Sequence, residues 1–270
     1  MTRELRAHIP EGPVPARDEG AWVLDLIRVM ARLRGPGGCP WDAEQDHRSL
    51  ARHLLEEAHE VLDAIDSGDP ARLRDELGDL LLQVVFHAEM AREAGQYDMD
   101  DVAEGIVAKL VRRHPHVFGE VEVAGADEVL TNWEKIKADE RGGRGHLEDD
   151  IPDTLPALAR ASKVQRRAAG FGFEWRTTEG AMAKLREEIE ELADAPPDRA
   201  EDEIGDVLFA AAAVARRLGV DPESALRRTT NRFADRYERM RMRAEAEGVD
   251  LEDMGEDELL AFFRASRDEG

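Results

Sequence analysis

The sequence predicts an all-α protein in which one helical-bundle unit occurs twice in tandem. Three observations lead to this prediction: the composition favours helices, apolar residues recur at helical spacing, and one acidic pattern appears twice in the same order. Charged residues make up 36% of the chain and aromatic residues only 5%, while the good helix formers Ala, Leu, Arg and Glu dominate. The 270 residues allow one large domain or two of ordinary size.

The charge balance and the single cysteine exclude several classes of protein. The chain has 60 acidic and 37 basic residues, a formal net charge of -23, which would repel the phosphate backbone of a nucleic-acid polymer. One cysteine, Cys39, excludes an internal disulfide framework and a zinc site built from cysteines. The longest apolar run, residues 207–215, has about half the ~20 residues of a membrane span. We therefore expect a cytoplasmic protein with no membrane segment.

The apolar spacing predicts the helices in order. Residues 1–20 contain three prolines and two glycines and are expected to form a flexible arm. Four helices should follow, beginning near residues 22, 49, 70 and 99. The third should have Asp69 as its N-cap and Pro70 in its first turn. A second group of helices is expected at residues 155–168, 178–194, 199–218, 222–247 and 256–267.

A segment rich in glycine and arginine separates the two groups of helices. Residues 141–145 have the sequence RGGRG, three acidic residues follow, and prolines stand at positions 152 and 156. The sequence therefore predicts an N-terminal domain at 21–140, a linker at 141–153 and a C-terminal domain at 154–270.

One acidic pattern occurs in both halves and carries the functional prediction. LLEEAHEV at 54–61 matches LREEIEEL at 185–192, and DELGDLL at 75–81 matches DEIGDVL at 202–208. At ~100° per residue these acidic side chains flank the apolar stripe of each helix, so two antiparallel helices would direct four carboxylates to one place. The carboxylates are Glu57, Glu60, Glu76 and Asp79 in the first copy and Glu188, Glu191, Glu203 and Asp206 in the second.

These clustered carboxylates predict a site for a hard divalent cation. One such motif is weak evidence, because composition alone would produce it about three times in this chain, and a solvated helix face would explain it. Its recurrence with apolar positions in register favours a function. Carboxylates that face one another repel unless a cation lies between them, and an all-oxygen site suits Mg²⁺ or Mn²⁺. A di-iron site built on Glu56 and His59 is an alternative, but the second copy contains no histidine.

Basic residues also repeat in this acidic chain. Lys109 and Arg113 align with Arg232 and Arg236, each pair four residues apart on one helix face. Farther along, Trp133 and Lys137 have the counterparts Phe263 and Arg267. Cations at this spacing could hold phosphate oxygens, and an aromatic ring could stack on a base. Salt bridges and core packing are the simpler alternative.

The whole set of motifs resembles the MazG family of nucleoside triphosphate pyrophosphohydrolases, within the all-α NTP pyrophosphatase superfamily. The resemblance runs from about Trp22 to Arg267. It implies tandem helical domains, a homodimer in which helices pair across subunits, and Mg²⁺-dependent conversion of NTP or dNTP to NMP and pyrophosphate, which would clear unwanted nucleotides. The motifs that carry it, besides the acidic pairs, lie at residues 38–42, 112–118, 132–134, 151–158 and 170–175.

The resemblance also implies a role for each candidate residue. The eight repeated carboxylates would be metal ligands, and Glu56 and Glu187 would lie beside them and could orient water. Phosphate-side or base-side positions would be Lys109, Arg113, Trp133 and Lys137 in the first domain and Arg232, Arg236, Phe263 and Arg267 in the second.

The C-terminal copy departs from the family pattern, although in well-studied relatives it is the active one. Phe263 stands where Trp is usual, and Arg232 and Arg267 stand where Lys is usual. The segment between its acidic motifs is also shortened near residues 196–197. The alternative function is therefore a catalytically weak nucleotide-binding or stress-regulatory dimeric partner protein, but the intact acidic sets in both copies favour the enzyme.

Overall fold

The computed structural model describes residues 20–125, 128–129, 132–133, 136, 140, 146–149 and 151–266. Two expected substrate-binding residues, Lys137 and Arg267, lie outside the described residues, as do positions 1–19 of the expected arm and part of the expected linker. The described residues form helices and loops, and none of them is in a strand. The prediction of an all-α fold is therefore confirmed.

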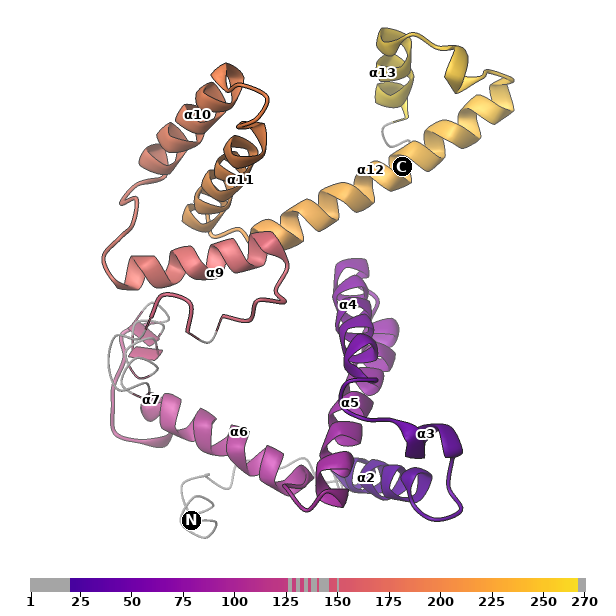
Figure 1. The fold of residues 1–270 in the computed structure, drawn as a ribbon, viewed down its shortest axis with the longest axis vertical. Coiled ribbons are helices and arrows are strands. Elements are labelled where there is room, and N and C mark those ends of the chain that lie inside the picture. The colour runs from indigo at the N-terminus through magenta and orange to yellow at the C-terminus, as the bar shows by residue number, and fades with distance from the viewer. Residues whose placement is uncertain are drawn as a thin grey trace. The chain divides into compact units, whose positions relative to one another are not determined.

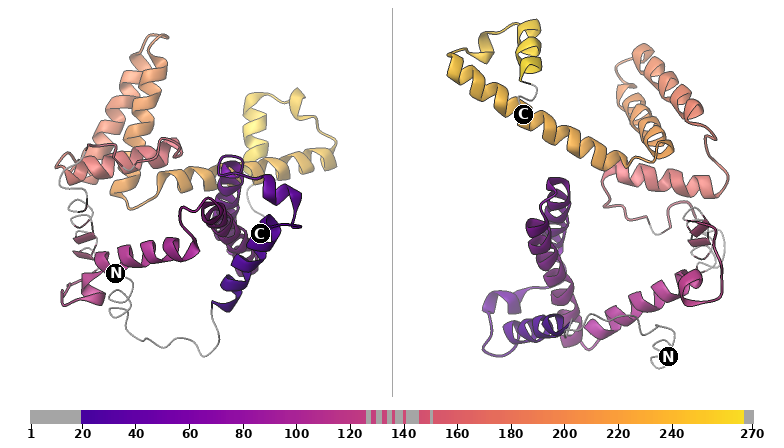
Figure 2. Two further views of the ribbon diagram at one scale, coloured as in Figure 1. Left: turned by 60° about the horizontal axis from the view of Figure 1, so that its bottom comes forward. Right: turned by 180° about the vertical axis from the view of Figure 1, so that it is seen from behind.

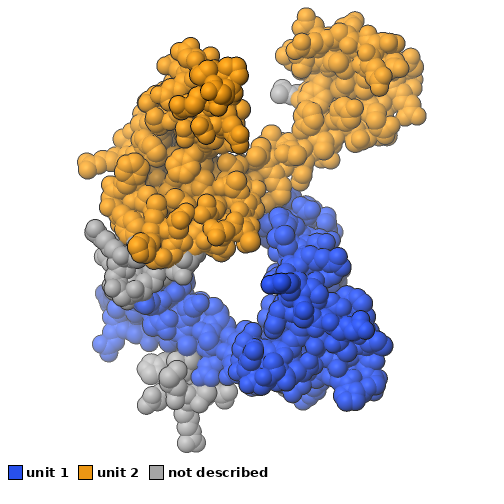
Figure 3. Space-filling model, in the orientation of Figure 1, with its two compact units in different colours: residues 1–144 blue, residues 145–270 orange. Residues whose placement is uncertain are grey.

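The chain divides into two compact units, residues 1–144 and 145–270 (Figure 3). The division falls inside the expected linker. Among the described residues, none of the helices combines the length and the apolar run that a membrane crossing would require.

The centre of the first unit is a hairpin of two antiparallel helices, α4 and α5 (Figure 1). Gly68 ends α4 with a left-handed backbone, φ 69°, and the Asp69 side chain accepts hydrogen bonds from the N–H groups of Ala71 and Arg72 at the start of α5. Helix α2 packs against α5, and a core of Met30, Leu50 and Val85 with neighbouring apolar residues lies near this junction. The helices of this unit are α2 (Ala21–Arg34), α3 (Pro40–Glu44), α4 (Ala51–Ser67), α5 (Pro70–Glu93), α6 (Met99–Arg113) and α7 (Pro115–Phe118).

The second unit repeats this hairpin as α10 and α11, which pack against each other (Figure 2). Helix α9 crosses α11, and there the buried Gln165 donates from Nε2 to the Phe209 carbonyl at 2.7 Å. Buried alanines of α11, such as Ala212 and Ala213, leave room for neighbouring helices to approach closely. The elements are α9 (Ala157–Gly170), α10 (Thr178–Asp194), α11 (Ala200–Arg217), α12 (Pro222–Glu247), the 3₁₀ turn η1 (Leu251–Asp253) and α13 (Glu256–Ala265).

The long helices follow the sequence prediction, whereas the short ones were not anticipated. The motif at 38–42 contains the start of α3, and α7 occupies four residues after His114. Both begin with a proline at the first helical position, where the fixed φ favours a helical turn. Helices of four or five residues are too short to show apolar periodicity, so the sequence pattern does not reveal them.

Candidate active site

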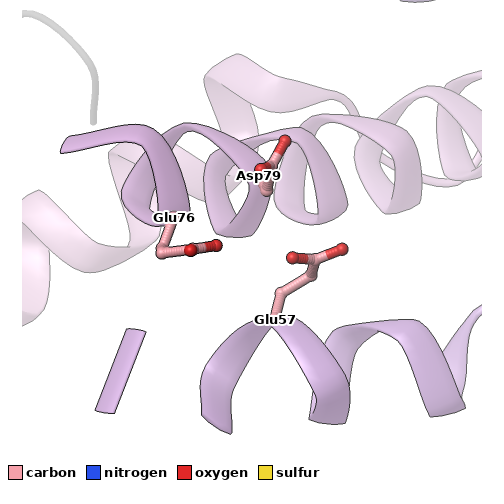
Figure 4. A group of neighbouring side chains, drawn as sticks. All are labelled: Glu57, Glu76 and Asp79. Carbon is pink, nitrogen blue, oxygen red and sulfur yellow. The ribbon is translucent and has the colours of Figure 1, made fainter. Parts of the chain in front are cut away.

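The hairpin of the first unit brings three of its four predicted carboxylates together. Glu57 on α4 and Glu76 and Asp79 on α5 each offer an oxygen atom, and these atoms all lie within 4.8 Å of one another. Figure 4 shows Glu57 reaching from its helix toward Glu76 on the facing helix. Glu57 and Glu76 are half-buried and Asp79 is exposed. We call this group, with its neighbour Glu60, the N-terminal cluster.

Negative charge accumulates in the N-terminal cluster. Burial raises the pKa of the Glu57 carboxyl above its usual value, and the charges of Asp79, Glu60 and Glu76 raise it further. Glu60 is exposed and is not among the three converging oxygens, yet it acts directly on Glu57. A single cation contacts the converging carboxylates among the described residues, Arg72, whose Nε lies 3.6 Å from Glu76 Oε1.

The hairpin of the second unit brings together the corresponding carboxylates. Glu188 on α10 and Glu203 and Asp206 on α11 offer oxygen atoms within 4.8 Å of one another, with Glu188 and Glu203 buried and Asp206 exposed. Burial raises the pKa of Glu191, and the charge of Glu188 adds to that effect, so Glu191 lies beside the group as Glu60 does in the first unit. We call these four residues the C-terminal cluster.

Two cations of the chain contact the C-terminal cluster, and sequence reasoning missed both. The Lys184 Nζ atom lies 2.8 Å from Glu188 Oε1 and 2.7 Å from Glu187 Oε1, and these carboxylates raise the pKa of the lysine above its usual value. The Arg199 guanidinium lies 2.9 Å from Glu203 Oε1. Each cation stands four residues before its carboxylate, Lys184 on α10 and Arg199 at the N-cap of α11, and this spacing is the signal that could have revealed it.

The donor set of both clusters fits a hard divalent cation. Within the described ranges, the two groups that could hold a metal consist of carboxylates only, and oxygen ligands suit Mg²⁺ and Mn²⁺ better than softer metals. His59 is exposed and belongs to neither group. The described side chains therefore give no support to the di-iron alternative.

A basic pocket lies between α12 and α13 in the second unit. Its volume is about 470 Å³. The Arg236 guanidinium lies 4.0 Å from the centroid of the Phe263 ring, and Arg236 Nε donates to the Phe263 carbonyl at 2.7 Å. The expected residues Arg232, Arg236 and Phe263 thus line one pocket. Its lining is completed by Thr229, Phe233, Asp235 and Arg239.

Arg239 and Phe233 also line the pocket, although the repeated basic pattern did not predict them. Arg239 lies seven positions after Arg232, or about two helical turns, so it falls on the same face of α12. The Phe233 ring is tilted against the Phe263 ring, with 5.2 Å between their centroids. The helical spacing was the available signal for Arg239, whereas the contact of Phe233 depends on where α13 folds back.

The first unit contains a related pair of a cation and an aromatic ring. The Arg113 guanidinium lies 5.5 Å from the centroid of the Trp133 ring. It also pairs with Glu140 at 2.6 Å, and Arg112 pairs with the same carboxylate at 2.7 Å. These hydrogen bonds lower the pKa of Glu140 to about 2. Lys109, the other expected phosphate-side residue, is exposed on α6.

The structure does not bring the basic pocket and the C-terminal cluster together within the second unit. The pocket is lined by residues of α12 and α13, while the cluster lies on α10 and α11. In the views of Figures 1 and 2, α13 lies at the end of α12 that is remote from the α10–α11 hairpin.

Comparison with known proteins places these features in one family. The family model described as "MazG nucleotide pyrophosphohydrolase domain" matches residues 45–118 and again residues 176–240. Each match contains one of the two acidic clusters. Together the matches cover just over half of the chain.

Similar proteins extend the resemblance beyond the matched segments. A Thermotoga maritima protein named "Nucleoside triphosphate pyrophosphohydrolase/pyrophosphatase MazG" is 40% identical over 93% of this chain and 98% of its own length. An Escherichia coli K12 protein named "Nucleoside triphosphate pyrophosphohydrolase" is 46% identical over 86% of this chain and 93% of its own length. A Mycobacterium tuberculosis protein with the same name is 44% identical over 59% of this chain and 48% of its own length. With the family domain matched twice and the Thermotoga maritima and Escherichia coli relatives aligned over nearly their whole lengths, the chain belongs to the MazG family.

Proposed function

We propose that this chain hydrolyses nucleoside triphosphates to nucleoside monophosphate and pyrophosphate, with Mg²⁺ held by the acidic clusters. The observation that carries the proposal is the convergence of three carboxylates in each hairpin, with ligand atoms within 4.8 Å and with oxygen donors only. The names of the similar proteins from Thermotoga maritima and Escherichia coli support the same reaction. Mn²⁺ satisfies the same donor set.

Different residues of the chain would hold the metal and the substrate. In the C-terminal cluster, Glu188, Glu191, Glu203 and Asp206 would hold the metal, which when bound lowers the pKa of water and neutralises charge on phosphate oxygens. Glu187 lies next to this group, where its carboxylate can accept a proton from water or orient it. The matching set in the first unit is Glu56, Glu57, Glu60, Glu76 and Asp79.

The basic pocket supplies groups that can bind phosphate and a base, which carboxylates alone do not. Arg232 and Arg236 can donate to phosphate oxygens, and guanidinium groups form strong charge-assisted hydrogen bonds with them. The Phe263 ring offers a face on which a base can stack. In the first unit, Lys109, Arg113, Trp133 and Lys137 are proposed for the same roles.

We further propose that the protein works as a homodimer in the cytoplasm. A chain with one cysteine has no internal disulfide, which fits a reducing compartment. Both hairpins expose apolar side chains beside the acidic residues, among them Leu77, Ile204 and Leu208, each about half exposed. A second copy would cover these side chains. It would also provide a way to bring the basic pocket to the C-terminal cluster, since the two lie apart within the second unit.

A panel of NTPs and dNTPs assayed with Mg²⁺ tests the proposed reaction. The expected products are NMP and pyrophosphate, with turnover abolished by excess chelator. Release of NDP and orthophosphate, or full activity in chelator, would contradict the proposal. Nucleotide binding without turnover would instead support the alternative of a catalytically weak nucleotide-binding or stress-regulatory partner protein.

A further inference from the structure

The two acidic clusters differ in the cations that already contact them. In the C-terminal cluster, Lys184 Nζ lies 2.8 Å from Glu188 Oε1, and Arg199 Nη2 lies 2.9 Å from Glu203 Oε1. The side chains of these two carboxylates are only 8% and 11% exposed. Two of the three converging carboxylates therefore have a positively charged partner that is part of the chain.

The N-terminal cluster lacks the first of these contacts. His53 stands four residues before Glu57, as Lys184 stands four residues before Glu188, but His53 Nδ1 contacts Glu56 instead, at 3.1 Å. Arg72 corresponds to Arg199 and lies farther from its carboxylate, with 3.6 Å between Arg72 Nε and Glu76 Oε1. In the part of the chain that the structure describes, no lysine or arginine is paired with Glu57 or Asp79.

The difference has an electrostatic consequence for a free divalent cation. A cation that enters the C-terminal cluster meets two positive charges and must compete with short ion pairs to buried carboxylates, where charges interact strongly. A cation that enters the N-terminal cluster relieves the repulsion among carboxylates that have little compensation. We infer that the N-terminal cluster is the tighter site for a free divalent cation and that Lys184, assisted by Arg199, holds down the affinity of the C-terminal cluster.

The inference rests on the proposed function, because it takes both clusters to be metal sites. The inference adds the order in which the two clusters bind their metal ions. A metal–triphosphate complex carries a net negative charge, so the positive charges that oppose a free ion do not oppose the complex. The N-terminal cluster is then occupied in the resting protein, and the C-terminal cluster acquires its metal together with the nucleotide.

Titration of the full chain with Mn²⁺, followed by electron paramagnetic resonance of the free ion, tests the inference without any measurement of activity. Two classes of site are expected, with dissociation constants at least about tenfold apart, or ~1.4 kcal/mol. The double variant Glu57→Gln, Glu60→Gln should lose the tight class, and Glu188→Gln, Glu191→Gln should lose the weak class. Lys184→Met removes the charge at similar volume and should move the weak class toward the tight one. The matched control, His53→Gln, should leave both classes unchanged.

Two further measurements keep the outcomes distinct. Arg199→Gln should shift the weak class in the same direction as Lys184→Met, and circular dichroism melting verifies that each variant folds. The inference is overturned if the tight class survives in the Glu57 and Glu60 double variant, or if neither Lys184→Met nor Arg199→Gln tightens the weak class. Pyrophosphate release is assayed separately. If the protein releases pyrophosphate but binds Mn²⁺ at two sites of equal affinity, only the inference is overturned. If it releases no pyrophosphate but binds Mn²⁺ in two distinct classes of site, only the proposed function is overturned.

Discussion

Arg236 and Phe263 form the centre of the basic pocket, with the guanidinium 4.0 Å from the centroid of the aromatic ring. The two residues are 27 positions apart, and a hydrogen bond from Arg236 Nε to the Phe263 carbonyl joins α12 to α13. Arg113 and Trp133 form the corresponding pair in the first unit, at 5.5 Å. This repeated pair is the basis on which we propose that a ring beside a guanidinium binds the nucleotide in each unit.

Removal of the Phe263 ring should weaken nucleotide binding. Stacking of a base on an aromatic ring contributes ~1–3 kcal/mol, so Phe263→Ala is expected to raise the KM for NTP by about 5- to 160-fold. Phe263→Trp keeps an aromatic face and should leave the KM unchanged or lower it. Steady-state kinetics on both variants provides the measurement. Equal KM values in the alanine variant and the unaltered protein would show that Phe263 is not part of the nucleotide-binding site.

The two acidic clusters should contribute unequally to turnover. Substitution of Glu188→Gln together with Glu191→Gln is expected to reduce NTP hydrolysis by roughly 10²-fold or more, because even outer partners of metal ligands typically contribute 10–100-fold. Glu57→Gln together with Glu60→Gln should have a smaller effect. Parallel assays at saturating metal decide the ranking. The reverse order would assign the chemistry to the first unit. No loss of activity in either variant would indicate that the carboxylates form only a solvated acidic helix face.

Acid should destabilise the contact around Glu140. The pKa of this carboxyl is lowered from 4.5 to about 2 by the hydrogen bonds from Arg113 and Arg112. A carboxyl with a lowered folded-state pKa stabilises the fold above its unfolded pKa, and the contribution is lost as pH falls from about 4.5 toward about 2.

Glu140→Gln is therefore expected to lower the Tm at neutral pH and to have little effect near pH 2. The pH dependence of the Tm, measured by calorimetry, compares this variant with the control Glu120→Gln, an exposed glutamate. A Tm difference between the Glu140 variant and the unaltered protein that stays constant across this range would contradict the ion-pair explanation.

The protein should be a dimer at micromolar concentration, with about twice the 30.2 kDa mass of the chain. Light scattering coupled to size-exclusion chromatography measures the mass. Leu208→Arg places a charge among the exposed apolar residues of the α10–α11 hairpin and should shift the population toward monomer. A monomeric mass for the unaltered protein would refute the proposed assembly.

The sequence by itself determined the long helices and the residues that form the acidic clusters. Helical periodicity and capping signals are local, so the bounds of α5 at Pro70 and of α6 at Met99 follow from neighbouring residues. The repeated acidic spacing likewise places Glu57 and Glu76 on the two antiparallel helices of one hairpin, where they face each other.

Only the tertiary structure decided which charges meet and what completes the pocket. Arg113 pairs with Glu140 from 27 positions away, and Phe233 meets Phe263 because α13 folds back on α12. Lys184 and Arg199 stand at a spacing that allows ion pairs, but a lysine or arginine on a helix surface can also remain solvated. Which of these occurs depends on whether the facing helix buries the carboxylate, and that burial is a property of the packed hairpin rather than of either helix alone.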